Sequence, residues 1–159
     1  MEQKVNVSKE QQLKDYNTVA DFLMSGNKKE VKEFANALNW AKFTEDTYKF
    51  MDIKFIRKYK DYIDWEMYCS NAELSEDFIR EFADYVDWYI ISLSQTLSED
   101  FIREFSEYVN WEGICERQQL SEGFIREFSE YVDWGCIDCF QHISDEFRAE
   151  FKEYLEETE

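Results

Sequence analysis

The stretch LSEDFIREF, residues 74–82, recurs along this chain of 159 residues at a constant spacing. It returns unchanged at residues 97–105 and as LSEGFIREF at residues 120–128, so successive copies lie 23 residues apart. After each copy the chain continues through Tyr-Val-Asp or Tyr-Val-Asn to a tryptophan. A further tryptophan upstream keeps the same spacing, which gives the series Trp65, Trp88, Trp111 and Trp134. A fixed period of this length indicates a tandem-repeat protein.

Looser copies extend the array in both directions. One begins at Met51, one begins near residue 26 and includes Trp40, and the last begins at Ile143 and ends where its tryptophan would stand. We therefore expect a single domain over residues 1–159, made of six units of about 23 residues. These units begin near residues 26, 51, 74, 97, 120 and 143.

Within a unit, the apolar residues recur at steps of three and four, which places them on one stripe of an α-helix. In the unit that begins at Leu74 they are Phe78, Ile79, Phe82, Tyr85 and Val86. Ser75 stands where an N-cap belongs, and two acids follow it in the first turn, where they favour the positive end of the helix dipole. These features predict a first helix of about 11 residues.

An aspartate or asparagine precedes every tryptophan and is a suitable N-cap for a second, shorter helix. These residues are Asn39, Asp64, Asp87, Asn110 and Asp133. One helix pair cannot bury its own apolar stripe, but stacked copies form a continuous core. The predicted fold is therefore all-α, a small α-solenoid of repeats in which a long helix is followed by a short one.

Residues 8–25 precede the first unit and are predicted to form an N-terminal capping helix. Ser8 and Gln11 suit a capping box at its start, and Gly26 suits its end. Its expected apolar face contains Leu13, Tyr16 and Leu23.

The composition is that of a folded, helical protein. Hydrophobic residues make up 44% of the chain and aromatic residues 18%, which is enough to bury a core. There is no proline and there are only four glycines, so long loops and tight hairpins are disfavoured. No apolar run is long enough to span a membrane, and no basic-then-apolar leader follows Met1. With four cysteines in apolar surroundings, we expect free thiols and a cytoplasmic location.

The formal net charge is −18, and it is unevenly distributed. Residues 1–50 contain eight acids and eight bases, whereas residues 74–159 contain 23 acids and six bases. A protein that holds nucleic acid needs Lys and Arg to displace counterions from the phosphates. Direct nucleic-acid binding by the C-terminal part is therefore disfavoured.

The sequence of these units resembles short repeats of uncharacterised bacteriophage and giant-virus proteins, which are rich in LSEDFIREF-type and Asp-Trp motifs. The resemblance covers residues 51–155 and is closest in the three central units. It implies a viral or mobile-element origin, and a host cell as the place where the protein acts. It implies no catalytic residue.

The segment Cys136-Ile-Asp-Cys139-Phe-Gln-His142 is a weak candidate for a metal site. Its two thiols and the only histidine lie at three-residue steps, and thiolate with imidazole suits zinc. A structural zinc site needs four ligands, however, and the nearest other cysteine, Cys115, belongs to the previous unit. We therefore expect thiols packed in the short-helix layer, with no bound metal and no cofactor.

No other pattern points to catalysis. No serine or cysteine has an identifiable base and orienting partner, and there is no glycine-rich phosphate loop or calcium loop. Most acids recur in the polar stripe of every unit, which is typical of a solvated face. We therefore expect a protein that is not an enzyme.

Four arginines occupy one register, and each has an acid four residues on. The pairs are Arg57 with Asp61, Arg80 with Asp84, Arg103 with Glu107, and Arg126 with Glu130. This spacing predicts a ladder of ion pairs on the helix surface.

Each of the three central units carries a net charge of −4. If adjacent repeats lie roughly 10 Å apart, the density along the repeat axis is about one net negative charge per 2.5 Å. Duplex DNA has a similar density along its axis, about one negative charge per 1.7 Å. The viral resemblance adds to this to predict an inhibitor of a host protein with a basic nucleic-acid-binding cleft, such as a defence nuclease or effector. The predicted contacts are acids of the first helices: Glu81, Asp84, Glu104, Glu107, Glu127 and Glu130.

The alternative is a protein-protein interaction scaffold that binds through its aromatic or concave surface without charge mimicry. Binding of other macromolecules is the usual work of solenoids. The two hypotheses differ in salt dependence, because exposed charges are screened and an apolar interface is not.

Overall fold

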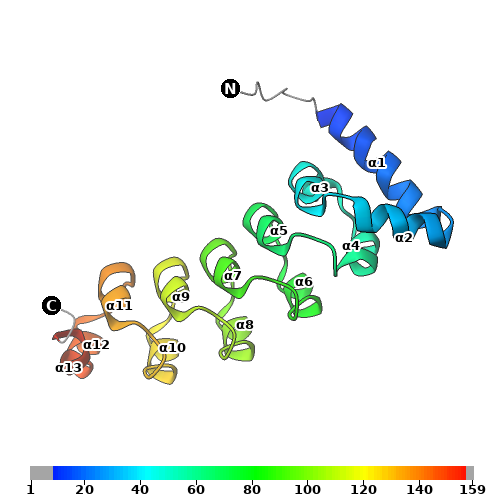
Figure 1. Cartoon of the computed structure of the whole chain (residues 1–159). Helices are drawn as coiled ribbons and strands as arrows, with labels where there is room; N and C mark the ends of the chain where they lie inside the picture. Colours follow the sequence, from blue (N-terminus) through cyan, green and yellow to red (C-terminus); the bar gives the residue numbers. More distant parts are fainter. Residues whose placement is uncertain (1–8, 157–159) are drawn as a thin grey trace. The chain divides into compact units, whose positions relative to one another are not determined.

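The computed structural model describes residues 9–156, and side chains from residue 11 onward. In this range every regular element is helical, with thirteen α-helices and one short 3-10 helix (Figure 1). The predicted all-α helical-repeat fold is confirmed. Ser8, the predicted N-cap of the first helix, lies outside the described residues.

The chain divides into two compact units, residues 1–72 (unit 1) and 73–159 (unit 2). The helices of unit 1 are α1 (Lys9–Ser25), α2 (Lys28–Ala37), α3 (Trp40–Thr47), the 3-10 helix η1 (Tyr48–Phe50), α4 (Ile53–Tyr59) and α5 (Trp65–Asn71). Those of unit 2 are α6 (Glu76–Glu81), α7 (Trp88–Ser94), α8 (Glu99–Glu104), α9 (Trp111–Arg117), α10 (Glu122–Glu127), α11 (Trp134–Phe140), α12 (Asp145–Glu150) and α13 (Lys152–Glu156). The expected single domain over residues 1–159 stays a prediction.

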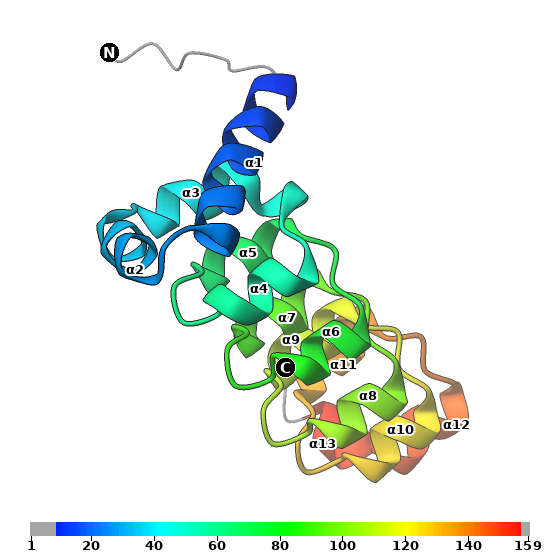
Figure 2. The same ribbon diagram turned by 90° about the vertical axis from the view of Figure 1, so that its right-hand side faces the viewer.

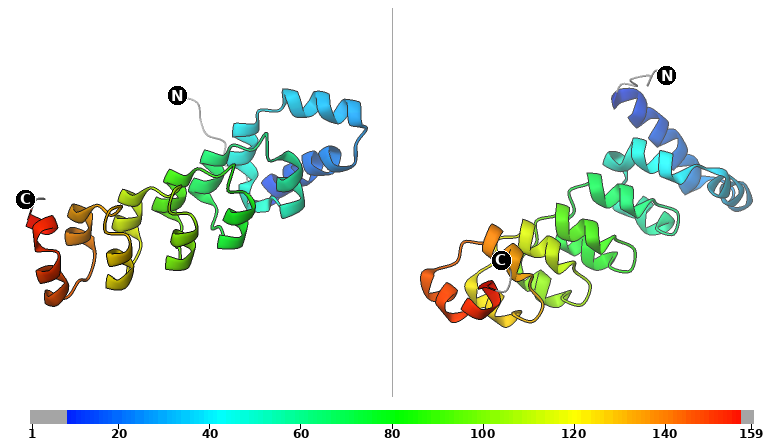
Figure 3. Two further views of the ribbon diagram at one scale, coloured as in Figure 1. Left: turned by 90° about the horizontal axis from the view of Figure 1, so that it is seen from below. Right: turned by 60° about the vertical axis from the view of Figure 1, so that its left-hand side comes forward.

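The helices of unit 2 form two rows. α7, α9 and α11 follow one another in one row, and α6, α8, α10 and α12 follow one another in the other (Figures 1 and 2). The repeats keep their sequence order along these rows in both views of Figure 3. Within unit 2, successive helix pairs are thus stacked on one another in sequence order, as in a solenoid.

The predicted N-caps are present at both helices of each repeat. The Ser75 hydroxyl accepts a hydrogen bond from the backbone N–H of Phe78 at 3.2 Å, and the Asp87 carboxylate accepts one from the N–H of Ile90 at 3.0 Å. Equivalent bonds occur in the later repeats at Ser98, Asn110, Ser121, Asp133 and Ser144. These caps satisfy backbone donors that a helix start leaves unpaired.

The first helix of each repeat is shorter than predicted. α6, α8, α10 and α12 each contain 6 residues instead of about 11, and the second helices α7, α9 and α11 contain 7. At Phe82 the backbone leaves the helical conformation, with φ −111° and ψ 27°. The chain then turns, and the backbone N–H groups of Tyr85 and Val86 both donate to the Phe82 carbonyl.

The tryptophan stabilises the turn that follows this end, although α12 ends in the same way in a repeat whose sequence has Glu157 at the tryptophan position. The indole Nε1–H of Trp88 donates to the backbone carbonyl of Ala83 at 3.0 Å, and Asp87 must be extended to cap the next helix. A continued helix would need that carbonyl for its own ladder. The same bond to the carbonyl five residues upstream occurs at Trp40, Trp65, Trp111 and Trp134.

Each of these tryptophans in unit 2 also stacks on the following repeat. The ring of Trp88 lies 4.9 Å from that of Phe105 and 5.6 Å from that of Tyr108, measured between centroids. Trp111 contacts Phe124, Phe128 and Tyr131 in the same way, and Trp134 contacts Phe147, Phe151 and Tyr154. The tryptophan therefore joins its own turn to the next helix pair.

A column of buried glutamines makes a second connection between repeats. Gln118 is 6% exposed, and its side-chain oxygen accepts from the backbone N–H of Leu97 at 3.0 Å. Its amide group donates back to the carbonyls of Gln95 at 2.8 Å and Ser92 at 3.3 Å in the preceding repeat. The members of this column are Gln95, Gln118 and Gln141.

In unit 1, α1 packs against α3 through Tyr16, which is buried against the rings of Phe43 and Phe55. Leu23 is fully buried, as predicted for the apolar face of α1. Leu13 is 41% exposed, so its predicted place on that face was wrong. α1 ends before Gly26, where a Cβ atom would lie 2.6 Å from the carbonyl oxygen of Phe22.

Replacing Trp111 by Ala is expected to destabilise the protein by about 3 kcal/mol, because the stack on the next repeat and the indole hydrogen bond are both lost. Trp111→Phe keeps much of the stack and is expected to cost about half as much. Urea unfolding followed by circular dichroism measures both. Equal costs for the two variants would contradict a stacking role.

Replacing Gln118 by Leu is expected to cost about 2–4 kcal/mol, because buried backbone groups in two repeats lose their partners. Gln119 is adjacent and exposed, so Gln119→Leu serves as the control and is expected to stay within about 0.5 kcal/mol of the wild type. Thermal and urea unfolding provide the comparison. A Gln118 variant as stable as the control would show that the column is dispensable.

Candidate functional site

The six predicted contact acids differ in their surroundings. Glu104 accepts from Arg80 Nε at 2.7 Å, and Glu127 pairs with Arg103 Nε at 2.8 Å. Both arginines belong to the preceding repeat, and Arg126 continues the series with Glu150 at 2.8 Å. These carboxylates are therefore already engaged in contacts between repeats.

This arrangement corrects three pairs of the predicted ladder, those of Arg80, Arg103 and Arg126, while the pair of Arg57 with Asp61 stays a prediction. Arg80 also lies within ion-pair distance of Glu76 and Asp77, upstream in its own helix, and not of Asp84. The helix ends before the downstream acid is reached, so the two side chains do not share a helical face. The guanidinium instead extends over the ring of Phe101, at 5.0 Å from its centroid.

Another set of acids connects the repeats through backbone groups. The backbone N–H of Ser98 donates to Glu76 at 2.7 Å, that of Ser121 to Glu99 at 2.6 Å, and that of Ser144 to Glu122 at 2.7 Å. The hydrogen bonds from Ser144 lower the pKa of Glu122. These glutamates therefore hold adjacent repeats together. The sequence pattern had grouped them with the solvent-exposed acids of the polar stripe.

Asp84, Glu107 and Glu130 are exposed, and within residues 9–156 no hydrogen bond or ion pair involves their carboxylates. Glu153 is exposed in the same register and is also without such a partner in this range. We call these four residues the acid column. Glu81, the remaining predicted contact, is exposed at the end of α6.

A tyrosine follows each member of the acid column. Tyr108 is 61% exposed, Tyr131 49% and Tyr154 52%. Sequence analysis placed this position in the apolar stripe, because its spacing continues the helical pattern past the real end of the helix. Tyr108, Tyr131 and Tyr154 instead lie at the edge of the core, with the ring against a tryptophan and much of the residue in solvent, whereas Tyr85 is half-buried.

The two units also differ in charge. Residues 1–72 contain 12 acids and 12 bases, whereas residues 73–159 contain 24 acids and six bases. All six bases of unit 2 lie in the described part and have an acidic partner: Arg80, Arg103, Arg117, Arg126, Arg148 and Lys152. Unit 2 therefore has more acids than its cations can neutralise.

The cysteines and the histidine do not form a metal centre in the described residues. Cys139 and His142 are exposed, Cys136 is half-buried, and no group of three or more potential ligands gathers within this range. Cys69 and Cys115 are buried as predicted, but the prediction that Cys139 is packed in the short-helix layer was wrong. Burial raises the pKa of Cys115 to about 12 and, together with Asp133, that of Cys136 to about 11, which disfavours their thiolates.

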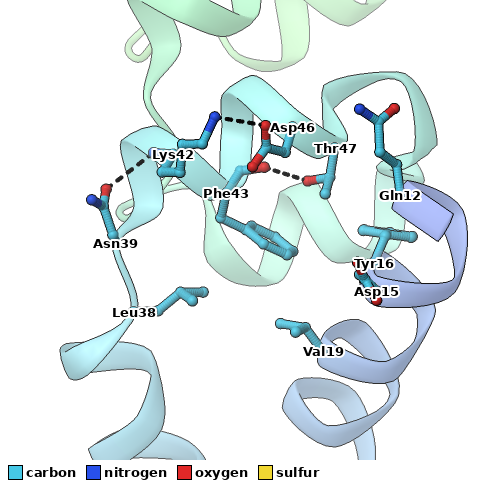
Figure 4. A pocket seen from close by; sticks show the side chains of 10 residues that line it. All are labelled: Gln12, Asp15, Tyr16, Val19, Leu38, Asn39, Lys42, Phe43, Asp46 and Thr47. Atoms are coloured by element: carbon cyan, nitrogen blue, oxygen red, sulfur yellow. Dashed lines mark hydrogen bonds and ion pairs between the residues drawn. The ribbon is translucent and has the colours of Figure 1, made fainter. Parts of the chain in front are cut away.

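Unit 1 contains a hollow of about 310 Å³ between α1 and α3 (Figure 4). Val19, Leu38 and Phe43 point into it. On its rim, Lys42 pairs with Asp46 at 2.8 Å, and the Thr47 hydroxyl donates to a backbone carbonyl. These polar groups are satisfied by one another, so the hollow has no evident chemistry of its own.

Comparison of the chain with known proteins yields no matching family model, no matching curated protein and no matching solved structure. Among the described helices, none is long and apolar enough to cross a membrane. The features on which a function can be argued are therefore the charge and the aromatic surface of unit 2.

The purified protein is expected to contain no stoichiometric zinc, and a native thiol titration is expected to modify Cys139 first and Cys115 only after unfolding. The physical reason is exposure, since the reactive thiolate of Cys115 is suppressed by burial. Elemental analysis and mass spectrometry of the labelled protein measure both. One zinc per chain that is lost in the variant with Cys136→Ala and Cys139→Ala would establish a metal site.

Proposed function

We propose that this chain is a non-enzymatic repeat protein that binds and inhibits a host protein, with unit 2 standing in for a nucleic-acid backbone. The observation that carries the proposal is the segregation of charge, with 24 acids against six fully paired bases in residues 73–159. The resemblance of the repeats to phage and giant-virus sequences supports a host target and a cytoplasmic site of action.

A cleft that holds nucleic acid recognises a regular line of negative charge with Lys and Arg. Unit 2 offers such a line, because identical repeats place the same acids at intervals of roughly 8–10 Å. The acid column is its most accessible part, since these carboxylates have no partner in the described residues. Glu104 and Glu127 add to the field, but they also hold repeats together.

The second candidate is a scaffold that binds a partner through its aromatic surface. The exposure of Tyr108, Tyr131 and Tyr154 favours it. Salt distinguishes the two, because binding by charge weakens steeply with ionic strength. Capture of partners from host lysate at low and high salt therefore identifies the target and ranks the two mechanisms.

Neutralising the acid column tests the mimicry directly. The variant with Asp84→Asn, Glu107→Gln and Glu130→Gln is expected to fold normally, because none of these side chains bonds within the described residues. Its association with the captured target is expected to slow, with a flatter salt dependence and weaker competition against DNA or RNA. Stopped-flow association and competition binding measure these effects.

The control removes the same charge from Glu73, Glu112 and Glu146, which are exposed and also unpaired within the described range. Because long-range steering depends on total charge, the control is expected to slow association less than the column variant and to leave dissociation unchanged. An acid-column variant with unchanged affinity and unchanged salt dependence would reject mimicry in favour of the scaffold.

A further inference from the structure

The segments after α8, α10 and α12 present the same pair of side chains in three successive repeats. These pairs are Glu107 with Tyr108, Glu130 with Tyr131, and Glu153 with Tyr154. All six side chains are exposed. We call this set the acid-tyrosine ridge.

The tyrosine ring has a packing role, but its hydroxyl does not take part in it. Tyr131 stacks on Trp111 at 5.5 Å between centroids, beside Phe128 at 5.0 Å on the same indole. A phenylalanine makes such a stack equally well, as it does at the neighbouring buried positions. A tyrosine nevertheless occupies the more exposed place in these three repeats, where about half or more of the residue is open to solvent.

The molecule already shows what a carboxylate beside an aromatic ring can hold. Arg103 lies over the ring of Phe124 at 5.1 Å and pairs with Glu127 at 2.8 Å, and Arg126 lies over Phe147 at 4.8 Å and pairs with Glu150 at 2.8 Å. A guanidinium combines stacking on a ring with a charge-assisted hydrogen bond to a carboxylate. The ridge has a carboxylate and an aromatic ring on adjacent residues in each of these repeats, and no arginine of the described residues pairs with its carboxylates.

The repeat spacing decides the form of a ligand that could fill several pairs at once. Packed helices of adjacent repeats lie roughly 8–10 Å apart. Three residues of a polyproline II segment rise about 9 Å and return the side chain to the same face. A β-strand would turn every third side chain to the opposite face, and an α-helix would need about seven residues to cover that distance.

We propose that the acid-tyrosine ridge is a docking track for an extended segment of a basic protein that carries an arginine at every third residue. Each guanidinium would lie against one tyrosine and pair with the adjacent carboxylate. This inference rests on the proposed function, since it specifies the partner that the acidic unit takes. Charge complementarity supports that partner, because every base of unit 2 is already paired.

Two peptides of identical composition test the track on the full chain. In the first, Arg-Ala-Pro is repeated four times; in the second, the four arginines are placed together and the remaining residues follow. The periodic peptide is expected to bind about fivefold more tightly or better, because it reaches several ridge pairs while the clustered one reaches fewer. Fluorescence anisotropy of labelled peptide at fixed ionic strength measures both.

Substitutions then locate the binding. The variant with Tyr108→Ser and Tyr131→Ser is expected to lose about two- to fivefold in affinity per tyrosine for the periodic peptide, and to bind the clustered peptide as before. Tyr89→Ser is the matched control, because Tyr89 is 59% exposed in unit 2 but lies on α7, outside the ridge. If the serine variant unfolds, the variant with Glu107→Gln and Glu130→Gln leaves the ring contacts in place and is expected to lose more affinity for the periodic peptide than for the clustered one.

The outcomes separate this inference from the function on which it rests. Equal binding of the two peptides, with no effect of the ridge substitutions, overturns the track and leaves binding by charge intact. A helical peptide with arginines at every seventh residue that binds more tightly than the periodic one overturns the extended partner. Failure of every basic peptide to bind at low salt overturns the proposed function itself.

Discussion

The tryptophan of each repeat is the interaction on which this structure depends. Its indole Nε1–H donates to the backbone carbonyl five residues upstream, in the turn after the first helix. Its ring contacts the aromatic residues of the following repeat. One side chain thus joins the turn of its own repeat to the helix pair of the next. The exposed tyrosines owe their position to the same stack.

Around this contact, the polar residues divide between structure and surface. The buried glutamines, the glutamates that bind serine N–H groups, and the arginine-glutamate pairs all connect one repeat to the next. Each is repeated in register, so a repeat contacts its neighbours through the same hydrogen bonds and rings. A repeat protein with six bases can therefore carry 24 acids in one compact unit, since four of the bases are placed where they bridge repeats.

This use of charge bears on function. Because every cation of unit 2 already has an acidic partner, a basic partner of the proposed kind would meet acids that have no competing cation. The acid column and the adjacent tyrosines are the parts of this surface that do no packing through their polar groups. The two proposed modes of binding, charge mimicry and aromatic recognition, therefore involve neighbouring side chains on the same surface. They differ in how strongly the affinity depends on salt.

The sequence alone determined the period, the phase of the repeats and the caps, because these follow from local chemistry. Ser75 and Asp87 cap their helices through bonds to residues three positions away, and such bonds are visible in a short window of sequence. The length of the first helix could not be predicted from such a short window. The helical spacing of apolar residues continues through Tyr85, although the helix ends at Glu81. Only the tertiary structure decided which acids remain free. Glu104 and Glu107 lie three residues apart and look equivalent in the sequence, but Glu104 meets an arginine 24 residues upstream while Glu107 faces solvent. That difference arises from the stacking of repeats, which brings together side chains that no local pattern connects.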